Sequence, residues 1–443
     1  MYTSREVVEY DVIVIGGGVS GLIAASIIAS QKKKVIVVDE YKYLGGNHIS
    51  QNIGNYTFDI GSFFFHDDSA FFSHFPSLLS LYIRAGASVG KIKPDGSVTT
   101  YPVDLRSDIL SLSVVEKIKV IFSLLYARLC VNPNRSALDF TVFWIGRRFG
   151  VLSGLIPYLE RFYSTDPSLI EAEFAKKRMG WVARTASVKG LLSRLRKRRG
   201  QKKNNPYIRP RDGFSCIYEG ARRLLESSGV TVALSVNIKK INRVASGRME
   251  LVLADRTINA REIYSTVPLA DSLSWCNLHC PPVLYGARLV TLFYTFNGER
   301  GFIDNVLYNF SCSGLWKRLT VHSDYYGTED GTSYFSVETT VCSEQRSIDY
   351  FDADFRADVT GKGIFRGNLS LVGSHTLEHA YPLYLSGAID ATAVARRDLD
   401  AYGVKSFGRQ GAYDYQPTAD VSSRMAENFV EGARNTTKSA TTD

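Results

Sequence analysis

One segment near the N-terminus restricts the possible folds more than any other feature of the chain. Residues 10–15 (YDVIVI) form a continuous apolar run rich in β-branched side chains, which predicts a buried parallel strand. The run is followed by a glycine-rich turn, residues 16–21 (GGGVSG), and residues 22–30 then predict a helix. A second predicted strand, residues 35–38, ends at Asp39. This strand–helix–strand order predicts a Rossmann-like α/β unit.

The turn between the first strand and the helix has the spacing expected of a dinucleotide site. Gly16 allows a tight turn, Gly18 lets a pyrophosphate approach the backbone, and Gly21 lets the helix pack against the strand. The helix N-terminus adds unpaired N–H groups and a partial positive charge. Asp39 can accept hydrogen bonds from ribose hydroxyls, and its neighbour Glu40 is the alternative acceptor. A glycine turn that binds no nucleotide is the weaker interpretation.

Length and composition predict an ordinary globular protein with more than one subdomain. The chain has 443 residues, of which 45% are hydrophobic, and 25 Tyr and 24 Phe suit either flat ligands or a large core. No apolar run reaches the ~18–20 residues that a membrane-spanning helix needs. The first residues do not resemble a secretory signal, so we expect a cytoplasmic protein without a transmembrane segment.

A basic run and a pair of cysteines could each indicate a further binding site. Residues 194–203 (RLRKRRGQKK) are strongly basic within a chain of net charge +9, and such a run either contacts nucleic acid or an anionic membrane, or is simply solvated. No nucleic-acid fold signature accompanies it, so we expect no nucleic-acid partner. Cys276 and Cys280 flank His279, but no second ligand pair follows, so we expect no metal site.

Several motifs in residues 44–105 resemble one enzyme family. They are residues 44–47 (LGGN), residues 60–68 (IGSFFFHDD) and residues 101–105 (YPVDL). Together they are similar to UDP-galactopyranose mutases, within the FAD superfamily that includes amine oxidases and protoporphyrinogen oxidase. The resemblance implies that the dinucleotide is FAD and that Gly45, Gly46 and Asn47 lie beside it. Phe63 stands where the family has its first histidine, and His66 matches the second.

The resemblance continues in the rest of the chain. It is carried by residues 175–179 (AKKRM), 316–320 (WKRLT), 380–382 (AYP) and 407–415 (FGRQGAYDY). It implies that the substrate diphosphate is bound by Arg178, Arg318, Tyr381 and Tyr415, which are residue types suited to phosphate oxygens. It also implies that Val236, Gly408 and Arg409 lie near the FAD. The family tryptophan that stacks on the nucleotide base is not recognisable here, and its possible substitutes are Phe162, Tyr163 and Trp181.

The predicted fold class is α/β, with a Rossmann-like FAD-binding domain of the GR2 type. We expect this domain to be assembled from residues 1–100, 205–265 and 385–443. A helical insertion is expected in residues 105–200, where residues 114–131 have helical periodicity with an apolar stripe. A largely antiparallel sheet is expected to form the substrate domain in residues 266–384, with strands at 289–294 and 333–337.

The resemblance implies an FAD-dependent pyranose/furanose mutase, an isomerase that acts on a small-molecule nucleotide sugar in polysaccharide biosynthesis. In that family reduced flavin attacks the sugar through its N5 atom and forms an adduct, so NAD(P)H or another reductant is needed. Arg409 would lie beside the flavin, and His66 is the first candidate for an acid or base. The alternatives are an oxidoreductase of the amine-oxidase or protoporphyrinogen-oxidase type and a flavin-binding protein without activity. A homo-oligomer is compatible with any of these three interpretations.

Overall fold

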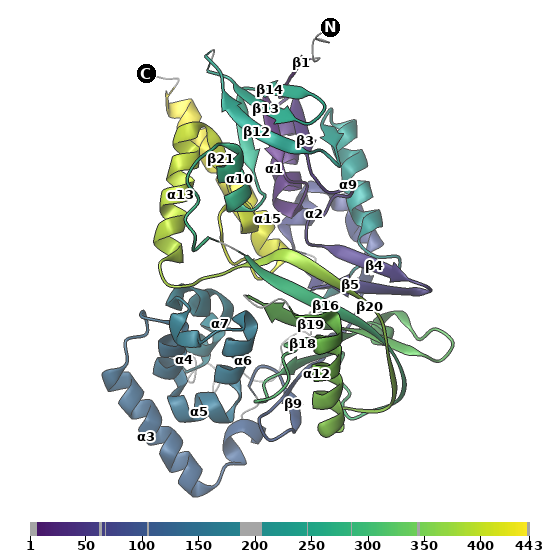
Figure 1. Cartoon of the computed structure of the whole chain (residues 1–443), viewed down its shortest axis with the longest axis vertical. Coiled ribbons are helices and arrows are strands. Elements are labelled where there is room, and N and C mark those ends of the chain that lie inside the picture. The colour runs from purple at the N-terminus through teal and green to yellow at the C-terminus, as the bar shows by residue number, and fades with distance from the viewer. Residues whose placement is uncertain are drawn as a thin grey trace.

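The computed structural model describes residues 7–61, 64–66, 68–103, 106–186, 206–245, 247–284, 286–342 and 346–440. Phe63 and the basic run of residues 194–203 lie outside the described residues. Figure 1 shows a parallel sheet with its helices at one end of the molecule, near both termini. A second sheet, built around two long strands, and a group of helices lie side by side at the other end.

The parallel sheet has five strands in the order β11-β3-β2-β15-β21, and all four pairings are parallel. The strands are β2 (Val12–Ile15), β3 (Val35–Val38), β11 (Thr231–Ala233), β15 (Glu262–Ser265) and β21 (Val404–Ser406). Helix α1 (Val19–Ser30) connects β2 to β3. The Rossmann-like unit predicted from the sequence is therefore confirmed, and its sheet is completed by strands from two distant parts of the chain.

Both faces of the parallel sheet are covered, which explains the unbroken apolar runs of its strands. Val12 and Val14 point to one face, where they pack with α1, α9 (Ser215–Ser227) and α15 (Ala419–Ala440). Ile13 and Ile15 point to the other face and join a separate core. That core contains α10 (Leu269–Trp275), α13 (Ala388–Tyr402) and a small sheet of strands β1 (Val7–Glu9), β14 (Thr257–Ala260), β13 (Met249–Leu253) and β12 (Ile238–Arg243).

A larger sheet has seven strands in the order β20-β16-β19-β18-β17-β8-β9. They are β20 (Phe365–Pro382), β16 (Gly286–Arg300), β19 (Ser333–Val341), β18 (Arg318–Val321), β17 (Val306–Asn309), β8 (Val89–Ile92) and β9 (Val98–Thr100). The strands expected at 289–294 and 333–337 are thus confirmed. Helix α12 (Ile348–Gly361) packs on this sheet. The β8–β9 hairpin, expected with the FAD-binding segment 1–100, extends this sheet instead because β8 pairs in parallel with β17.

The helical part follows β9 in the chain. It contains the π-helical turn η2 (Arg106–Leu110), α3 (Val114–Cys130), α4 (Ala137–Ile145), α5 (Arg147–Leu152), α6 (Leu155–Tyr163), η3 (Pro167–Leu169) and α7 (Ala172–Ala186). Its core lies among α4, α6 and α7 and includes Phe140, Leu159 and Phe174. Across the described ranges, no helix combines the length and the apolar character that crossing a membrane requires.

Shorter elements join these parts. They are the hairpin of β4 (Ile49–Ile53) and β5 (Tyr56–Ile60), the small sheet of β6 (Phe64–Phe65), β10 (Tyr207–Ile208) and β7 (Ile83–Arg84), and the helices α2 (Ala70–His74), η1 (Pro76–Leu81), α11 (Ser323–Tyr326) and α14 (Gly408–Gly411). The β5 strand contacts β19, so the hairpin lies against the seven-stranded sheet.

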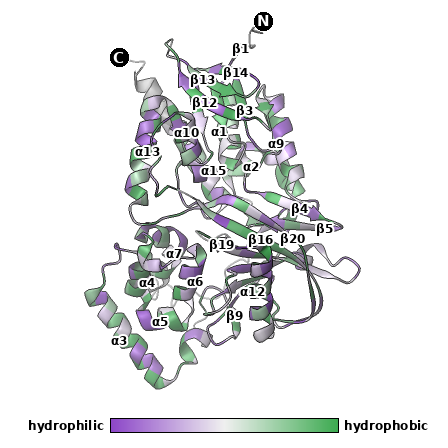
Figure 2. Cartoon of the chain, viewed as in Figure 1, coloured by the Kyte–Doolittle hydropathy of each residue, from purple (hydrophilic) through white to green (hydrophobic). Residues whose placement is uncertain are grey.

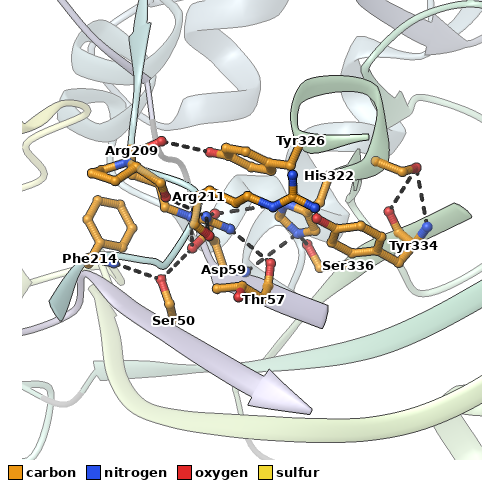
Figure 3. Close-up of polar contacts among 12 residues, drawn as sticks. Ser50, Thr57, Asp59, Arg209, Arg211, Phe214, His322, Tyr326, Tyr334 and Ser336 are labelled. Carbon is orange, nitrogen blue, oxygen red and sulfur yellow. Dashed lines mark hydrogen bonds and ion pairs between the residues drawn. The ribbon is translucent and has the colours of Figure 1, made fainter. Parts of the chain in front are cut away.

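A fully buried ion pair holds three of these parts together (Figure 3). The Arg209 Nε atom donates to both carboxylate oxygens of Asp59 at 2.8 Å, and neither side chain is exposed. The remaining guanidinium N–H groups donate to the carbonyl oxygens of Thr57, Pro210 and Arg211. The Tyr326 hydroxyl in α11 donates to the Arg209 carbonyl at 3.1 Å. The pair therefore links β5, the segment before α9, and α11.

Candidate functional site

A cavity of about 550 Å3 lies between the parallel sheet and the seven-stranded sheet. One end is walled by backbone from the two glycine turns and by the acids that follow β3. The other end is walled by charged and aromatic side chains from α6, α7, β17, β18, β19 and β20. We call these the glycine end and the basic end.

The glycine end begins where β2 meets α1. Gly18 is the N-cap residue of α1, no side chain forms a capping hydrogen bond there, and the first turn contains no acidic residue. Gly16, Gly18, Val19 and Ser20 line the cavity. The first N–H groups of the helix and its dipole are therefore available to an anion.

A second glycine turn lies directly against the first in the cavity wall. The Gly45 N–H donates to the Gly17 carbonyl at 2.9 Å, which fixes the two turns together. A Cβ atom on Gly18 would lie 3.8 Å from the Gly46 Cα, and one on Gly46 would lie 3.2 Å from the Gly18 Cα. The wall therefore has no side chains where the two turns meet, and a phosphate group can approach the backbone there. These residues fit the pyrophosphate of a dinucleotide.

The acid at the end of β3 also faces this end. Asp39 is 8% exposed, and its two oxygens accept the N–H groups of Gly17 at 2.6 Å and Tyr41 at 2.8 Å. Burial raises the pKa of Asp39, and these two hydrogen bonds oppose that change. Each oxygen keeps a lone pair that can accept a ribose hydroxyl. Glu40 lines the cavity too, but it is exposed, and its Oε1 atom accepts the Ile238 N–H at 3.4 Å.

Three cations and one buried carboxylate characterise the basic end. Arg318 and Glu338 are register partners on β18 and β19, and the Arg318 Nε atom donates to Glu338 Oε1 at 2.9 Å. The Lys317 Nζ atom lies 3.6 Å from Glu338 Oε2 and donates to the Tyr381 hydroxyl at 3.1 Å. Arg178 comes from α7, and its Nε atom is buried without a hydrogen-bond partner among the described residues. One carboxylate therefore faces three cations.

Tyrosine hydroxyls surround the three cations. Arg178 Nη2 donates to the Tyr158 hydroxyl at 2.8 Å, and Tyr308 is the register partner of Arg318. Burial alone would raise the pKa of Tyr308, but the charges of Arg318 and Arg178 outweigh it and the pKa lies below its ordinary value. Tyr381 and Tyr415 complete this wall. The basic end is thus electropositive and rich in hydroxyl groups, which suits an anion with several oxygen atoms.

Arg409 and His48 are two further ionisable residues of the wall. Arg409, in α14, donates from Nη2 to the Gln416 carbonyl at 2.7 Å, while its buried Nε atom has no partner within the described part of the chain. His48 forms a hydrogen bond with the Tyr218 hydroxyl and stacks on Phe214 at 5.0 Å. Burial and the charge of Arg409 lower the pKa of His48 to about 4. His48 is therefore neutral near pH 7.

The cavity brings together most of the residues singled out in the sequence. Its wall contains Gly16, Gly18, Asp39, Glu40, Gly45, Gly46, Asn47, Arg178, Arg318, Tyr381, Arg409 and Tyr415. Gly21, Val236 and Gly408 lie behind the wall. A Cβ atom on Gly21 would lie 1.9 Å from the Gly16 carbonyl oxygen, and one on Gly408 would lie 2.9 Å from Ser20, so both glycines allow close packing. Val236 is buried, and its N–H donates to the Asp39 carbonyl.

The structure does not bring His66 to the cavity. Phe64 lines the wall and Phe65 is buried in the core, whereas His66, directly after β6, is exposed and is not on the wall. Of the three candidates for base stacking, only Phe162 lines the cavity. Tyr163 is fully buried, and its hydroxyl donates to the Pro382 carbonyl at 2.8 Å.

Sequence reasoning missed several wall residues, namely His48, Tyr158, Tyr308 and Lys317. Lys317 directly precedes Arg318, and alternation along a strand would place the two on opposite faces. Both reach the cavity because β18 begins only at Arg318. Within the residues that the structure describes, no group of three or more His, Cys, Asp or Glu side chains is arranged to hold a metal ion.

Comparison with known proteins agrees with this architecture. A family model described as an NAD(P)-binding Rossmann-like domain matches residues 14–76. Seventeen per cent of residues are identical to those of a reduced UDP-galactopyranose mutase, which superimposes with a TM-score of 0.77 over 96% of this chain and 94% of that chain. The chain therefore shares the fold of UDP-galactopyranose mutase, with a Rossmann-like dinucleotide-binding domain near its N-terminus.

Enzymes of other activities share the same fold. Putrescine oxidase bound to putrescine superimposes with a TM-score of 0.60 at 13% identity, over 97% of this chain and all of that chain. A fatty acid isomerase from P. acnes gives a TM-score of 0.60 at 11% identity, over 95% of this chain and 98% of that chain. Identities this low show the fold alone.

A curated relative matches over a short segment. Prolycopene isomerase from Daucus carota is 34% identical over 108 residues, which is 23% of this chain and 16% of that protein. The Arabidopsis thaliana enzyme is 43% identical over 53 residues, which is 12% of this chain and 9% of that protein. The match therefore spans less than a fifth of the relatives' own length.

Proposed function

We propose that the chain is an FAD-dependent mutase that interconverts the pyranose and furanose forms of a nucleotide sugar. One observation carries this proposal: Arg178, Lys317 and Arg318 face the same cavity as the glycine end, and Glu338 is the carboxylate that pairs with Lys317 and Arg318. A sugar nucleotide carries two negative phosphate charges, which such a cluster neutralises. An amine substrate would be repelled by the same charges.

The glycine end is assigned to FAD. In this proposal Gly16, Gly18 and the start of α1 hold the pyrophosphate, Gly45, Gly46 and Asn47 lie along the chain toward the flavin, and Asp39 binds the ribose. Val236 supports this assignment indirectly, because its N–H holds the Asp39 backbone. When bound and reduced by NAD(P)H or another donor, FAD supplies the nucleophile for the anomeric carbon.

The basic end is assigned to the diphosphate. Arg178 and Arg318 each carry a guanidinium that can bind phosphate oxygens, and Tyr381 and Tyr415 offer hydroxyl groups. These groups stabilise the charge that develops when the diphosphate leaves the sugar, and they hold the diphosphate until it returns. Phe162 provides an aromatic face for the nucleotide base.

Two residues are assigned by their position. Arg409 has an unpaired Nε atom and lies beside Tyr381 and Tyr415, with 5.4 Å from its Cζ atom to the Tyr381 ring, so we place it between cofactor and substrate. Neutral His48 would border the cofactor, because it follows Asn47 in the second glycine turn. We assign no part in the reaction to His66, whose exposed side chain is not on the cavity wall.

The proposal is tested by incubating the purified protein, loaded with FAD, with a panel of nucleotide sugars with and without dithionite. An isomer of unchanged mass that forms only under reduction would support the mutase. Hydrogen peroxide release with an amine substrate and no isomer would favour an oxidase. Isomerisation of a polyene or fatty acid, with no change in any nucleotide sugar, would instead favour the type of activity that the names of the prolycopene and fatty acid isomerases indicate.

Diphosphate binding should weaken as the pH rises past 8, because Lys317 loses its charge. Burial lowers the pKa of Lys317 to about 8, with Glu338 opposing and Arg318 assisting the change. The ammonium is therefore present below this pH and is lost above it. We expect the Kd of a nucleotide sugar to rise about tenfold between pH 7 and 9.5, since a charge-assisted hydrogen bond contributes about 1.5 kcal/mol. Isothermal titration measures this. The Lys317→Met variant should bind more weakly at pH 7 and lose most of this pH dependence, with the remainder due to ionisation of Tyr308, whose pKa is also lowered. An unchanged slope would contradict the assignment.

Replacing Arg178 should weaken diphosphate binding without unfolding the helix that carries it. Arg178→Met removes a guanidinium with an unpaired Nε atom, and we expect the Kd of a nucleotide sugar to rise about 30- to 100-fold, or about 2–3 kcal/mol. Lys176→Met is the matched control, because Lys176 lies on the same helix with an exposed side chain 3.8 Å from Glu173. Equal Kd values for the two variants would rule out the role given to Arg178.

A further inference from the structure

Helix α3 carries its large apolar side chains on the outside of the molecule. Eight of them are between 48% and 87% exposed, namely Val114, Val115, Ile118, Ile121, Phe122, Leu125, Tyr126 and Leu129. A helix on the surface of a globular protein ordinarily turns such residues toward the core. Leu110, just before the helix, is also 66% exposed.

These side chains share one face of the helix. Their spacing of three, four and seven residues places them in a single stripe along α3, whose 17 residues span about 25 Å. Ala127, on the opposite face, is fully buried, and α3 contacts α4 and α5. Figure 1 places α3 at an outer edge of the molecule, away from the parallel sheet, and Figure 2 shows hydrophobic and hydrophilic residues alternating along it. The apolar face is therefore directed away from the bundle.

Basic residues border the apolar face. Lys117, Lys119 and Arg128 lie along its two sides, and Glu116 is the only acidic residue of α3. Glu116 is already paired with Lys119 at 3.0 Å and with Arg148 at 2.7 Å. Residues 114–152 contain six basic and two acidic residues, and the chain has a net charge of +9. The surroundings of the apolar stripe are positive.

From this combination we infer that α3 docks on an anionic lipid bilayer, lying in the plane of its surface. The apolar side chains would enter the boundary between head groups and acyl chains, while Lys117 and Lys119 reach the lipid phosphates. Arg128 adds positive charge at the border while it stacks on Trp144, with its Cζ atom 4.5 Å from the ring centroid. A second copy of the chain fits less well, because pairing two α3 helices would bring their basic borders together. This inference does not depend on the proposed activity.

The test is co-sedimentation of the full chain with vesicles. Vesicles of phosphatidylcholine with about 30% phosphatidylserine should bind the protein, pure phosphatidylcholine should bind it more weakly, and about 0.5 M salt should release part of it. The double variant L125E/L129E should lose binding about tenfold or more. Ile303→Glu is the matched control, because Ile303 is 90% exposed and lies outside α3. Retained FAD content shows that each variant is folded.

Three results would overturn the inference. The first is no binding of the wild type to anionic vesicles, and the second is equal binding of L125E/L129E and the wild type. The third is a concentration-dependent dimer, seen by light scattering and abolished in L125E/L129E, in a protein that does not bind vesicles. That result would assign the apolar face of α3 to a second copy of the chain.

Discussion

Replacing Gly18 with aspartate is expected to abolish FAD binding while the apoprotein stays folded. The new carboxylate would occupy the open space between Gly18 and Gly46, where the cofactor pyrophosphate is proposed to lie. Two unit charges about 4 Å apart repel by about 4 kcal/mol at an effective dielectric constant of about 20, so the affinity should fall about 1,000-fold. The flavin absorbance that remains after gel filtration, and a titration of the apoprotein with FAD, measure this loss.

Aspartate is chosen at position 18 so that loss of the cofactor can be distinguished from unfolding of the protein. Gly18 has φ −75° and ψ 178°, which aspartate adopts without strain, and aspartate is a favourable N-cap residue for α1. The thermal midpoint of the Gly18→Asp apoprotein should therefore equal or exceed that of the wild-type apoprotein. Gly86→Asp is the control, because Gly86 is exposed and a Cβ atom there would meet nothing within 4 Å. A Gly18→Asp protein that still binds FAD as the wild type does would show that the glycine end is not the pyrophosphate site.

Removing the carboxylate of Asp59 should destabilise the protein more than other single truncations of an ion pair. Asp59→Ala would leave the Arg209 guanidinium buried with no counter-charge, and breaking such a pair costs about 3–5 kcal/mol. The loss should affect the junction of β5, the segment before α9, and α11, which this pair connects (Figure 3). Urea unfolding followed by tryptophan fluorescence measures the change in the free energy of unfolding.

Two further variants test the cause of that loss. Glu329→Ala removes the partner of Arg211, an exposed arginine two residues after Arg209, and should cost less than about 1 kcal/mol because the pair is partly exposed to solvent. The double variant D59L/R209M replaces the buried pair by apolar side chains and should recover part of the stability that Asp59→Ala loses. If Asp59→Ala were no more harmful than Glu329→Ala, the ion pair would not be the connection that we describe.

The first two strands of the parallel sheet and the helix between them could be predicted from residues 10–39, because their pattern is local. A continuous apolar run, a glycine turn and a helix define β2, α1 and β3 within about thirty residues. The position of the β8–β9 hairpin could not be predicted in this way. Its pairing with β17 joins residues about two hundred positions apart, and nothing in either strand specifies that partner. The exposure of the apolar stripe of α3 could not be predicted either. Periodicity shows that a helix has an apolar face, but it does not show what covers that face.

Some residues of the candidate site could likewise be predicted from the sequence, and others could not. The glycines and Asp39 could be recognised because backbone geometry restricts those positions to particular residue types. Arg178, Arg318, Tyr381 and Tyr415 were predicted through resemblance, and the structure places all four on one cavity wall. Lys317 and His48 lacked such a signal. Lys317 reaches the wall because it precedes β18, and His48 because it follows the second glycine turn.

In the function that we propose, one cavity holds FAD at its glycine end and a diphosphate at its basic end. This proposal is tested most directly by titrating the FAD-loaded protein with a nucleoside diphosphate, the matching nucleoside and putrescine, while the flavin absorbance is recorded. We expect the diphosphate to perturb the flavin spectrum and to bind at least about tenfold more tightly than the nucleoside, and Arg178→Met to remove most of this difference. Reduction of the flavin by putrescine, with no response to the diphosphate, would contradict the proposal.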